Sequence, residues 1–308
     1  MLDMKQIDFT ISAYKDSIPD SEYERLEFFR GLWEAQATAA DKYAESVSYR
    51  VPSADELRDL SERSVAVLSV FPARIEPEAI AATAAEIASL MSSFDQFDAS
   101  NRQALAKVSW ERIVAASDSS LAGSDPAAYV DACEALLVDD GLSADAARIG
   151  ASAISLALRA LLQGAAEAIQ KARLDGKADQ PYPTHCPVCA SPAGAARVGS
   201  GGKTKGRSRT LWCPQCGCVW DFERVRCARC GTQNQGHLHF FNVEGDDSHR
   251  IQTCDECGGY IRTVYEEDDP LKNLYPFSFE VEDVLMARLD LIAYRQLVAQ
   301  DMQTSEQA

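Results

Sequence analysis

Eight of the ten cysteines in this 308-residue sequence form four C-x-x-C pairs, which read CPVC (186–189), CPQC (213–216), CARC (227–230) and CDEC (254–257). The first residues, MLDMKQIDFT, lack the basic start and apolar core of a secretory signal, so we expect a reducing compartment. In that setting, paired cysteines are typical of metal binding or redox chemistry rather than of a disulfide framework.

The four pairs form two copies of one unit. The third and fourth pairs repeat the first and second after 41 residues, and 23 residues separate the inner cysteines in both copies. Arg209 and Gly217 recur at the same distance as Arg250 and Gly258. A fixed period that covers every candidate ligand predicts two tandem modules.

Each module can hold one metal ion, because two C-x-x-C turns complete a tetrahedral site of four sulfurs, as in a zinc ribbon or a rubredoxin. Zinc and iron both suit such a site. The repeat favours sequential pairing of the turns; a cross-brace that links the first pair to the third, and redox-active dithiols, are the alternatives. The predicted ligands are Cys186, Cys189, Cys213 and Cys216 for the first ion, and Cys227, Cys230, Cys254 and Cys257 for the second.

The residue after each cysteine pair is predicted to adopt a positive φ, which lets backbone amides point at the sulfurs. Glycine tolerates this conformation and occupies the position at Gly217, Gly231 and Gly258, but Ala190 occupies it in the first pair. We expect Ala190 to strain its turn by roughly 1 kcal/mol or to impose another geometry. Because modules of this size lack an independent core, the ions are expected to stabilise the fold.

The chain before the cysteines reads as helical. Ser53 and Glu56 fit a capping box that opens a helix towards Phe71. Ser143 fits the cap of a long helix, rich in alanine and leucine, that reaches Arg173. The predicted buried face of that long helix consists of Ile154, Leu158, Leu161, Leu162, Ala165 and Ile169.

Short strands and a final helix follow. The predicted strands are Thr210–Trp212, Val219–Phe222, His237–Val243 and Tyr260–Tyr265. The predicted stripe of the final helix is Val281, Leu285, Leu289 and Ile292. The sequence therefore predicts an α+β multidomain fold: an all-α domain over 1–180, two rubredoxin-like or zinc-ribbon modules over 181–223 and 224–265, and a C-terminal helical tail over 266–308.

Composition excludes several classes of protein. A hydrophobic content of 46% and a charged content of 25% fit a soluble protein with a sizeable core. The apolar stretch Ile149–Leu158 is shorter than the roughly 20 residues that span a membrane. The net charge of −17 disfavours nucleic acid and anionic membranes, because phosphate binding needs a cationic surface. Only the cysteine region has more basic than acidic residues and could by itself bind phosphate groups.

Three weaker candidates accompany the cysteine pairs. Cys218 is either a reactive thiol beside the metal or, more simply, a small buried hydrophobic residue. The basic segment Arg197–Arg209 is either a contact for phosphates or an acidic partner, or a solvated hairpin tip. His237 and His239 share one face of a strand, where packing or a surface role is expected. The sequence contains no P-loop, Rossmann fingerprint or HExxH motif, so we expect no enzyme and no catalytic residue.

The runs CPVCASPAG, TLWCPQCGCVWDFERVRCARCG, LHFF and TCDECGGYIRTVYEEDDP resemble the FdhE family of formate dehydrogenase accessory proteins. The resemblance covers residues 181–273 in detail and includes the link from Trp220 through Arg224 to Cys227. It implies a cytoplasmic, non-catalytic protein that binds the molybdenum- or tungsten-containing catalytic subunit of respiratory formate dehydrogenase and is required for its activity. It also implies rubredoxin-like modules that hold iron.

An accessory protein acts through a protein contact, which favours exposed aromatic residues and arginine. We expect this surface at the junction of the two modules; the alternative is that the aromatic residues fill the core between them. The candidates are Trp220, Arg224, Arg226, Arg229, His237, His239, Phe240 and Phe241. Two other functions stay open: a rubredoxin-like redox or sulfur carrier, and a less favoured nucleic-acid-binding zinc ribbon that uses Arg197–Arg209 and nearby arginines.

Overall fold

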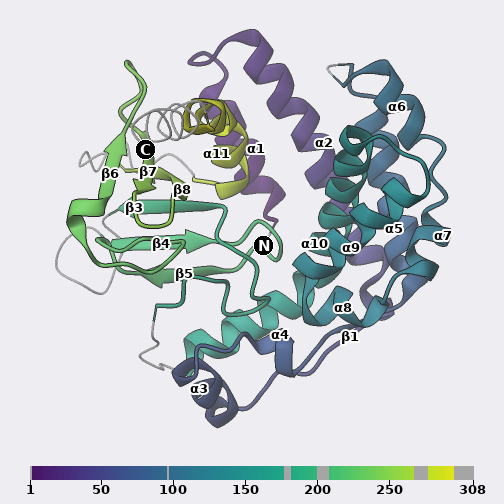
Figure 1. Cartoon of the computed structure of the whole chain (residues 1–308), viewed down its shortest axis with the longest axis horizontal. Helices are drawn as coiled ribbons and strands as arrows, with labels where there is room; N and C mark the ends of the chain where they lie inside the picture. Colours follow the sequence, from purple (N-terminus) through teal and green to yellow (C-terminus); the bar gives the residue numbers. More distant parts are fainter. Residues whose placement is uncertain (1, 96, 177–181, 200–207, 267–276, 295–308) are drawn as a thin grey trace, which may run out of the picture.

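The computed structural model describes residues 2–95, 97–176, 182–199, 208–266 and 277–294, in which helices pack against one six-stranded sheet (Figure 1). The chain therefore has the predicted combination of a helical region and a sheet. The helical region consists of α1 (Met4–Tyr14), α2 (Asp20–Lys42), α3 (Ala54–Glu62), α4 (Val67–Val70), α5 (Pro77–Ser92), α6 (Ala99–Leu105), α7 (Trp110–Ala116), α8 (Ser119–Ser124), α9 (Pro126–Asp139) and α10 (Ala144–Asp175), with the two-residue strands β1 (Val47–Ser48) and β2 (Arg74–Ile75).

The long helix α10 forms the centre of the helical region, and the sequence predicts its start and its buried face correctly. Ser143 caps it by accepting a hydrogen bond from the amide of Ala146 at 3.2 Å, and all six residues of the predicted face are buried. It packs against α2, α5 and α9. The helix is long and apolar enough to cross a membrane, but 67% of its apolar stretch is buried within the protein, as in the core helix of a soluble protein.

The helix that opens at Ser53 ends earlier than the sequence predicts. The capping box of Ser53 and Glu56 is present, yet α3 stops at Glu62 instead of continuing towards Phe71. Ser64 adopts a φ of 54°, which a right-handed helix does not contain, and the chain resumes as the four-residue α4. This break is what allows α4 to reach the first cysteine pair.

The two cysteine modules share one sheet. Its strands are β3 (Ala195–Gly199), β4 (Ser208–Trp212), β5 (Val219–Phe222), β6 (Leu238–Phe241), β7 (His249–Cys254) and β8 (Tyr260–Tyr265), in the order β5-β4-β3-β8-β7-β6. Each module supplies three antiparallel strands, and the modules join where β3 runs parallel to β8. The three strands of each module follow one another in the same order across the sheet. The second module is therefore related to the first by a shift from strand to strand.

The sequence predicts four of these strands, whereas β3 and β7 are additional. β3 contains Arg197 and β4 contains Arg209, so both ends of the predicted basic loop are paired strands, and residues 200–207 lie outside the described residues. β6 is shorter than predicted, because His237 belongs to the short helix η2 (Gln235–His237). The domain boundaries at residues 180, 223 and 265 stay predictions.

The C-terminal helix packs back on the structure, as expected. α11 (Phe279–Leu285) is followed by helical residues 287–294, and residues 295–308 lie outside the described part of the chain. In the predicted stripe, Val281, Leu285 and Leu289 are buried and Ile292 is partly buried. The ring of Phe279 stacks on Trp212 of β4, with 5.6 Å between the ring centroids.

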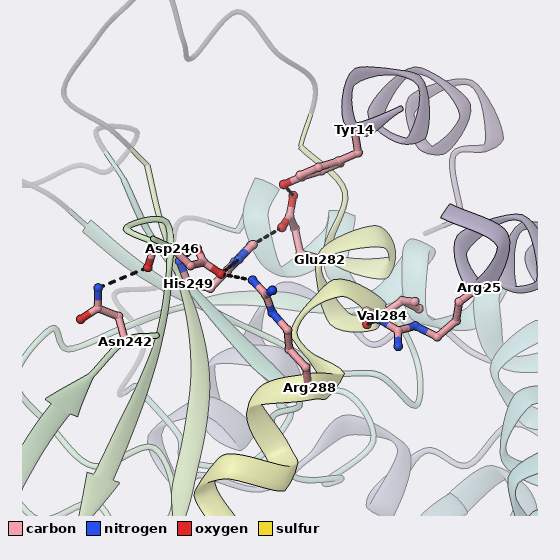
Figure 2. A network of polar contacts seen from close by, with 8 residues as sticks. All are labelled: Tyr14, Arg25, Asn242, Asp246, His249, Glu282, Val284 and Arg288. Carbon is pink, nitrogen blue, oxygen red and sulfur yellow. Dashed lines mark hydrogen bonds and ion pairs between the residues drawn. The ribbon is translucent and has the colours of Figure 1, made fainter. Parts of the chain in front are cut away.

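A buried charged network connects α1, α11 and the sheet (Figure 2). His249, at the start of β7, contacts Asp246 through Nδ1 at 2.9 Å and Glu282 through Nε2 at 2.8 Å. Tyr14 donates to Glu282 at 2.9 Å, and Arg288 donates to Asp246 at 2.5 Å. Burial alone would lower the pKa of His249, but the hydrogen bonds and charges of the two carboxylates outweigh it and raise this pKa to about 9. The imidazole is therefore charged at neutral pH.

Candidate metal centres

All four C-x-x-C turns have the same backbone geometry. In each turn, the amide of the first cysteine donates to the carbonyl five residues later, and the amide after the second cysteine donates back to the first cysteine's carbonyl. The N···O distances of these eight bonds lie between 2.9 and 3.1 Å. The amides of Val188 and Arg229 also donate to the sulfurs of Cys186 and Cys227, at 3.4 and 3.3 Å. The turns thus direct their thiols to one side.

The sulfurs gather into two quartets, as sequential pairing predicts and a cross-brace does not. The first quartet is Cys186, Cys189, Cys213 and Cys216; the second quartet is Cys227, Cys230, Cys254 and Cys257. Sγ–Sγ distances between the two turns of a quartet are 3.5 and 3.6 Å in the first and 3.8 Å twice in the second. The Sγ atoms within each quartet lie within 4.8 Å of one another.

These distances fit a bound ion. A Zn–S bond of about 2.3 Å in a regular tetrahedron separates the sulfurs by about 3.8 Å. Burial raises the pKa of the Cys186 and Cys213 thiols well above the ordinary thiol value, whereas hydrogen bonds from the other cysteines lower the pKa of Cys189. Without an ion the quartet therefore does not carry four thiolates, and a cation is needed to hold them together. Each quartet could therefore hold one metal ion.

The first quartet lies between the helices and the sheet, and its four cysteines are buried. The backbone amides of Val67 and Leu68, at the start of α4, donate to the carbonyls of Pro187 and Val188 at 3.0 and 2.9 Å. One helix of the N-terminal region is thereby hydrogen-bonded directly to the first cysteine turn.

The central helix α10 holds the second cysteine turn in the same way. Ser155 exchanges two hydrogen bonds with Gln215, at 2.8 and 3.1 Å. Arg159, which is 5% exposed, donates to the carbonyl of Pro214 at 2.6 Å and forms an ion pair with Glu280 at 2.5 Å. Sequence reasoning missed these contacts, because the periodicity of a helix does not indicate which distant turn its polar residues meet.

The second quartet lies at the surface. Cys230 and Cys257 are exposed, whereas Cys227 and Cys254 are buried and pack with Leu238. One side of an ion bound here would therefore be accessible to solvent, a chelator or another protein. The two quartets share their local geometry but differ in their surroundings.

The first cysteine turn keeps the common geometry in spite of its alanine. Ala190 has a φ of 64°, compared with 76°, 80° and 64° at Gly217, Gly231 and Gly258. Alanine therefore carries the left-handed conformation predicted for this position, and the alternative of another geometry does not occur.

Replacing this alanine by glycine is expected to stabilise the protein. Ala190→Gly should raise the free energy of unfolding by about 1 kcal/mol, because relief of the left-handed strain outweighs the added freedom of the unfolded chain. Gly258→Ala is the matched control and should lower it by a similar amount, since a Cβ there meets nothing within 4 Å and only φ opposes it. Denaturant unfolding measures both; equal stabilities for Ala190→Gly and the parent would contradict the argument.

Among the residues that the structure describes, the other cysteines and histidines form no further group that could hold an ion. Cys218 is 1% exposed and its carbonyl accepts the amide of Cys213, so it is a buried residue of the second turn. His237 lies 3.6 Å from Glu256, and His239 lies 2.7 Å from Asp255. These pairs give the histidines the surface role that the sequence favours.

The predicted contact surface needs a correction. Trp220 is only 6% exposed, because its indole packs in the core and donates to the carbonyl of Pro183 at 2.9 Å. Arg226 donates to the carbonyls of Gly231 and Tyr182 at 3.0 and 2.9 Å, and so supports the third cysteine turn. For Trp220, the alternative of a core role is confirmed.

Within the described residues, the arginines of the predicted basic patch do not gather on one exposed surface either. Arg197 pairs with Glu266, Arg209 is buried, and Arg229 is half-buried and donates to the carbonyl of Tyr260 at 3.0 Å. Within the described residues, Arg224 is the exposed member of the set.

No family model matches the chain. An FdhE homolog of Pseudomonas aeruginosa is 36% identical over 92 residues, which cover 28% of this chain and 29% of the relative. The FdhE protein of Escherichia coli O9:H4 is 34% identical over 87 residues, or 28% and 27% of the two chains. A homolog of Aquifex aeolicus is 30% identical over 115 residues, or 37% and 38%. The matched segments thus span well under half of these relatives.

The fold agrees over a much longer range. The crystal structure of the FdhE protein from Pseudomonas aeruginosa superposes with a TM-score of 0.51 and 17% identity, covering 95% of this chain and 89% of that one. At this identity the superposition shows the fold alone. The chain is therefore similar to several FdhE proteins in sequence over the matched segments, and it shares its fold with an FdhE protein over most of its length.

Proposed function

We propose that this chain is a non-catalytic, cytoplasmic accessory protein that binds the catalytic subunit of formate dehydrogenase and is needed for its activity. The similarity to FdhE proteins in sequence and in fold supports this proposal. The eight paired cysteines are its proposed metal ligands, and they hold two ions per chain, iron or zinc. The ion of the first quartet joins the helices to the sheet, and the ion of the second quartet shapes an exposed ribbon.

The exposed ribbon supplies the proposed contact surface. Phe240 is 46% exposed on β6, and His239 beside it is exposed as well. Arg224 is exposed on the segment that leads into the third cysteine turn. Exposed aromatic and arginine side chains are typical of protein contacts, so we place the catalytic subunit against this side.

A rubredoxin-like redox carrier is the second candidate function, and the exposure of Cys230 and Cys257 favours it. If the second quartet holds iron, an electron can reach it without crossing the protein core. The anaerobically purified protein would then be coloured and would show a reversible potential that Cys257→Ser abolishes. A colourless zinc protein would exclude this role.

The accessory function is tested by capture and by rescue. Arg224→Glu with Phe240→Ser should reduce capture of the co-expressed catalytic subunit at least tenfold, and should fail to restore formate dehydrogenase activity in a strain that lacks its own FdhE protein. The loss of an aromatic anchor and an arginine at an interface costs about 2 kcal/mol or more, which exceeds the roughly 1.4 kcal/mol of a tenfold weaker affinity.

Lys171→Glu with Leu174→Ser is the matched control. Both residues are exposed at the end of α10, and Leu174 is 69% exposed. This control should behave like the parent in both assays, and both double variants should retain two ions. Capture at the parent level by the Arg224/Phe240 variant would show that the surface is wrong. Failure of the parent itself to capture the subunit and to rescue activity would refute the accessory function.

A further inference from the structure

One arginine connects the two cysteine modules. Arg226 directly precedes Cys227, the first cysteine of the second quartet, and its side chain donates in two directions. Its Nε donates to the carbonyl of Gly231 at 3.0 Å, and its Nη1 donates to the carbonyl of Tyr182 at 2.9 Å. Gly231 closes the third cysteine turn, whereas Tyr182 leads into the first one. A single planar guanidinium therefore ties the two turns together.

The segment that begins at Tyr182 belongs to the first module. The indole of Trp220 in β5 donates to the carbonyl of Pro183 at 2.9 Å. His185 then forms an antiparallel bridge with Pro192, across the first cysteine turn. A displacement of the first turn is therefore passed on to the carbonyl of Tyr182.

The first module also holds the backbone of Arg226. Arg209 in β4 is 2% exposed, and its Nη1 donates to the carbonyl of Arg226 at 3.0 Å. β4 leads directly into Cys213 of the first quartet. Arg250, which occupies the position of Arg209 in the repeat, instead lies with its guanidinium carbon 4.2 Å from the centroid of the Tyr265 ring. The contact with Arg226 therefore belongs to the join between the modules rather than to the repeated unit.

The join is closely packed around the third cysteine turn. A Cβ at Gly231 would lie 3.1 Å from Nη2 of Arg226 and 3.4 Å from Cγ2 of Thr184, a residue of the first module. The guanidinium carbon of Arg226 lies 5.3 Å from the centroid of the Phe222 ring, at the end of β5. Closely packed groups transmit a displacement to their neighbours instead of absorbing it.

We propose that Arg226 couples the two metal centres, so that an ion in the second quartet slows the release of the ion from the first. Release from the first quartet requires its two cysteine turns to open locally. Arg226 resists this opening by holding Tyr182 against Gly231, but only while Gly231 is itself held in place. An ion in the second quartet supplies that hold, because it fixes the third turn through Cys227 and Cys230.

The coupling makes the exposed centre a control point for the buried one. Cys230 and Cys257 of the second quartet are exposed, so a chelator reaches this ion first. Its loss loosens the third turn and thereby shortens the lifetime of the ion in the first quartet. The inference rests on the proposed metal ligands, but not on the proposed contact with formate dehydrogenase.

Isotope exchange in the full-length, zinc-loaded protein tests the coupling. A second zinc isotope is added at a fixed free concentration, which keeps both centres loaded, and native mass spectrometry follows its entry. We expect a fast phase from the second quartet and a slow phase from the first. Cys257→Ser should remove the fast phase and accelerate the slow phase about tenfold, a factor within the usual range of coupling between two sites.

Replacement of Arg226 shows whether the effect passes through this residue. In Arg226→Gln, the slow phase should be about tenfold faster than in the parent, and the addition of Cys257→Ser should change it no further. If Arg226→Gln does not fold, Arg226→Lys serves instead, because one ammonium does not reproduce the two bonds of a planar guanidinium. Val225→Gln, at a neighbouring residue that is 44% exposed, is the matched control and should respond to Cys257→Ser like the parent.

The coupling is overturned, while the metal ligands stand, if the slow phase has the same rate in the parent and in Cys257→Ser. It is also overturned if Cys257→Ser accelerates the slow phase equally with and without Arg226. A parent protein that retains no zinc would refute the metal ligands themselves, and the coupling with them.

Discussion

Cys213→Ser is expected to remove one metal ion and to unfold the protein, whereas Cys257→Ser removes one ion from a protein that stays folded. A structural zinc site contributes about 10–16 kcal/mol of binding free energy, which is as large as the roughly 5–15 kcal/mol that stabilises a whole domain. The first quartet is buried between α4, α10 and the sheet. Loss of its ion therefore removes the contact that holds the helices against the sheet. The second quartet is half exposed and supports only its own ribbon.

Metal analysis, near-UV circular dichroism and limited proteolysis measure this difference. Cys218→Ser is the matched control, because Cys218 is a buried thiol of the same region that belongs to neither quartet. It should keep two ions and the parent's spectrum. A folded Cys213→Ser protein, or one that loses both ions when Cys257 is replaced, would contradict the assignment of one structural and one peripheral site.

The second large effect concerns the charged network of His249. Glu282→Gln is expected to lower the free energy of unfolding at pH 7 by about 3 kcal/mol, the usual cost of breaking a buried ion pair. A shift of the His249 pKa from 6.5 to about 9 corresponds to a similar figure. The effect should be large because His249 is 6% exposed, and because Glu282 also accepts a hydrogen bond from the hydroxyl of Tyr14.

The pH dependence gives a second measure of the same network. The pKa of His249 is raised on folding, so its stabilising contribution is complete below pH 6.5 and is lost as the pH rises to 9 and above. Burial opposes ionisation of Asp246, but the hydrogen bonds from His249 and Arg288 outweigh it and lower this pKa to about 2. Its contribution is therefore present above pH 3.8 and is lost as the pH falls through 2.

Thermal unfolding of the metal-loaded protein between pH 6 and 10 should show the loss on the alkaline side, and His249→Asn should flatten it. Imidazole resonances of the four histidines, followed by NMR, give the pKa directly. His239→Asn is the control, because its exposed contact with Asp255 contributes little. A His249 resonance that titrates near pH 6.5 would refute the network as described.

The sequence predicted what depends on local chemistry. Cysteine spacing indicated both quartets and their sequential pairing, and the cap at Ser143 and the apolar face of α10 followed from helical periodicity. The positive φ at Ala190 followed from its position after a cysteine pair. In each case, the residues that define the feature lie close together in the chain or repeat with a fixed period.

What the sequence missed depends on contacts between distant segments. β3 was missed because its sequence, AARVG, shows no alternation of polar and apolar residues, and its neighbour β8 lies more than 60 positions away. The burial of His249 and Arg209 could not be predicted, since a histidine or an arginine in a strand usually faces water. We expected Trp220 on a contact surface, because tryptophan is common both in protein interfaces and in protein cores.

The parallel pairing of β3 with β8 also has a consequence for the order of events during synthesis. At about 5–20 residues per second, the ribosome needs roughly 2–9 s to extend the chain from the end of β5 to the end of β8. Throughout that interval, β3 is an unpaired edge of the first module's sheet. Another chain could pair a strand with such an edge. Early binding of a metal ion by the first quartet would fold the first module before β8 covers its edge. The second module, once synthesised, covers this edge with β8 and so protects the first module from pairing with another chain.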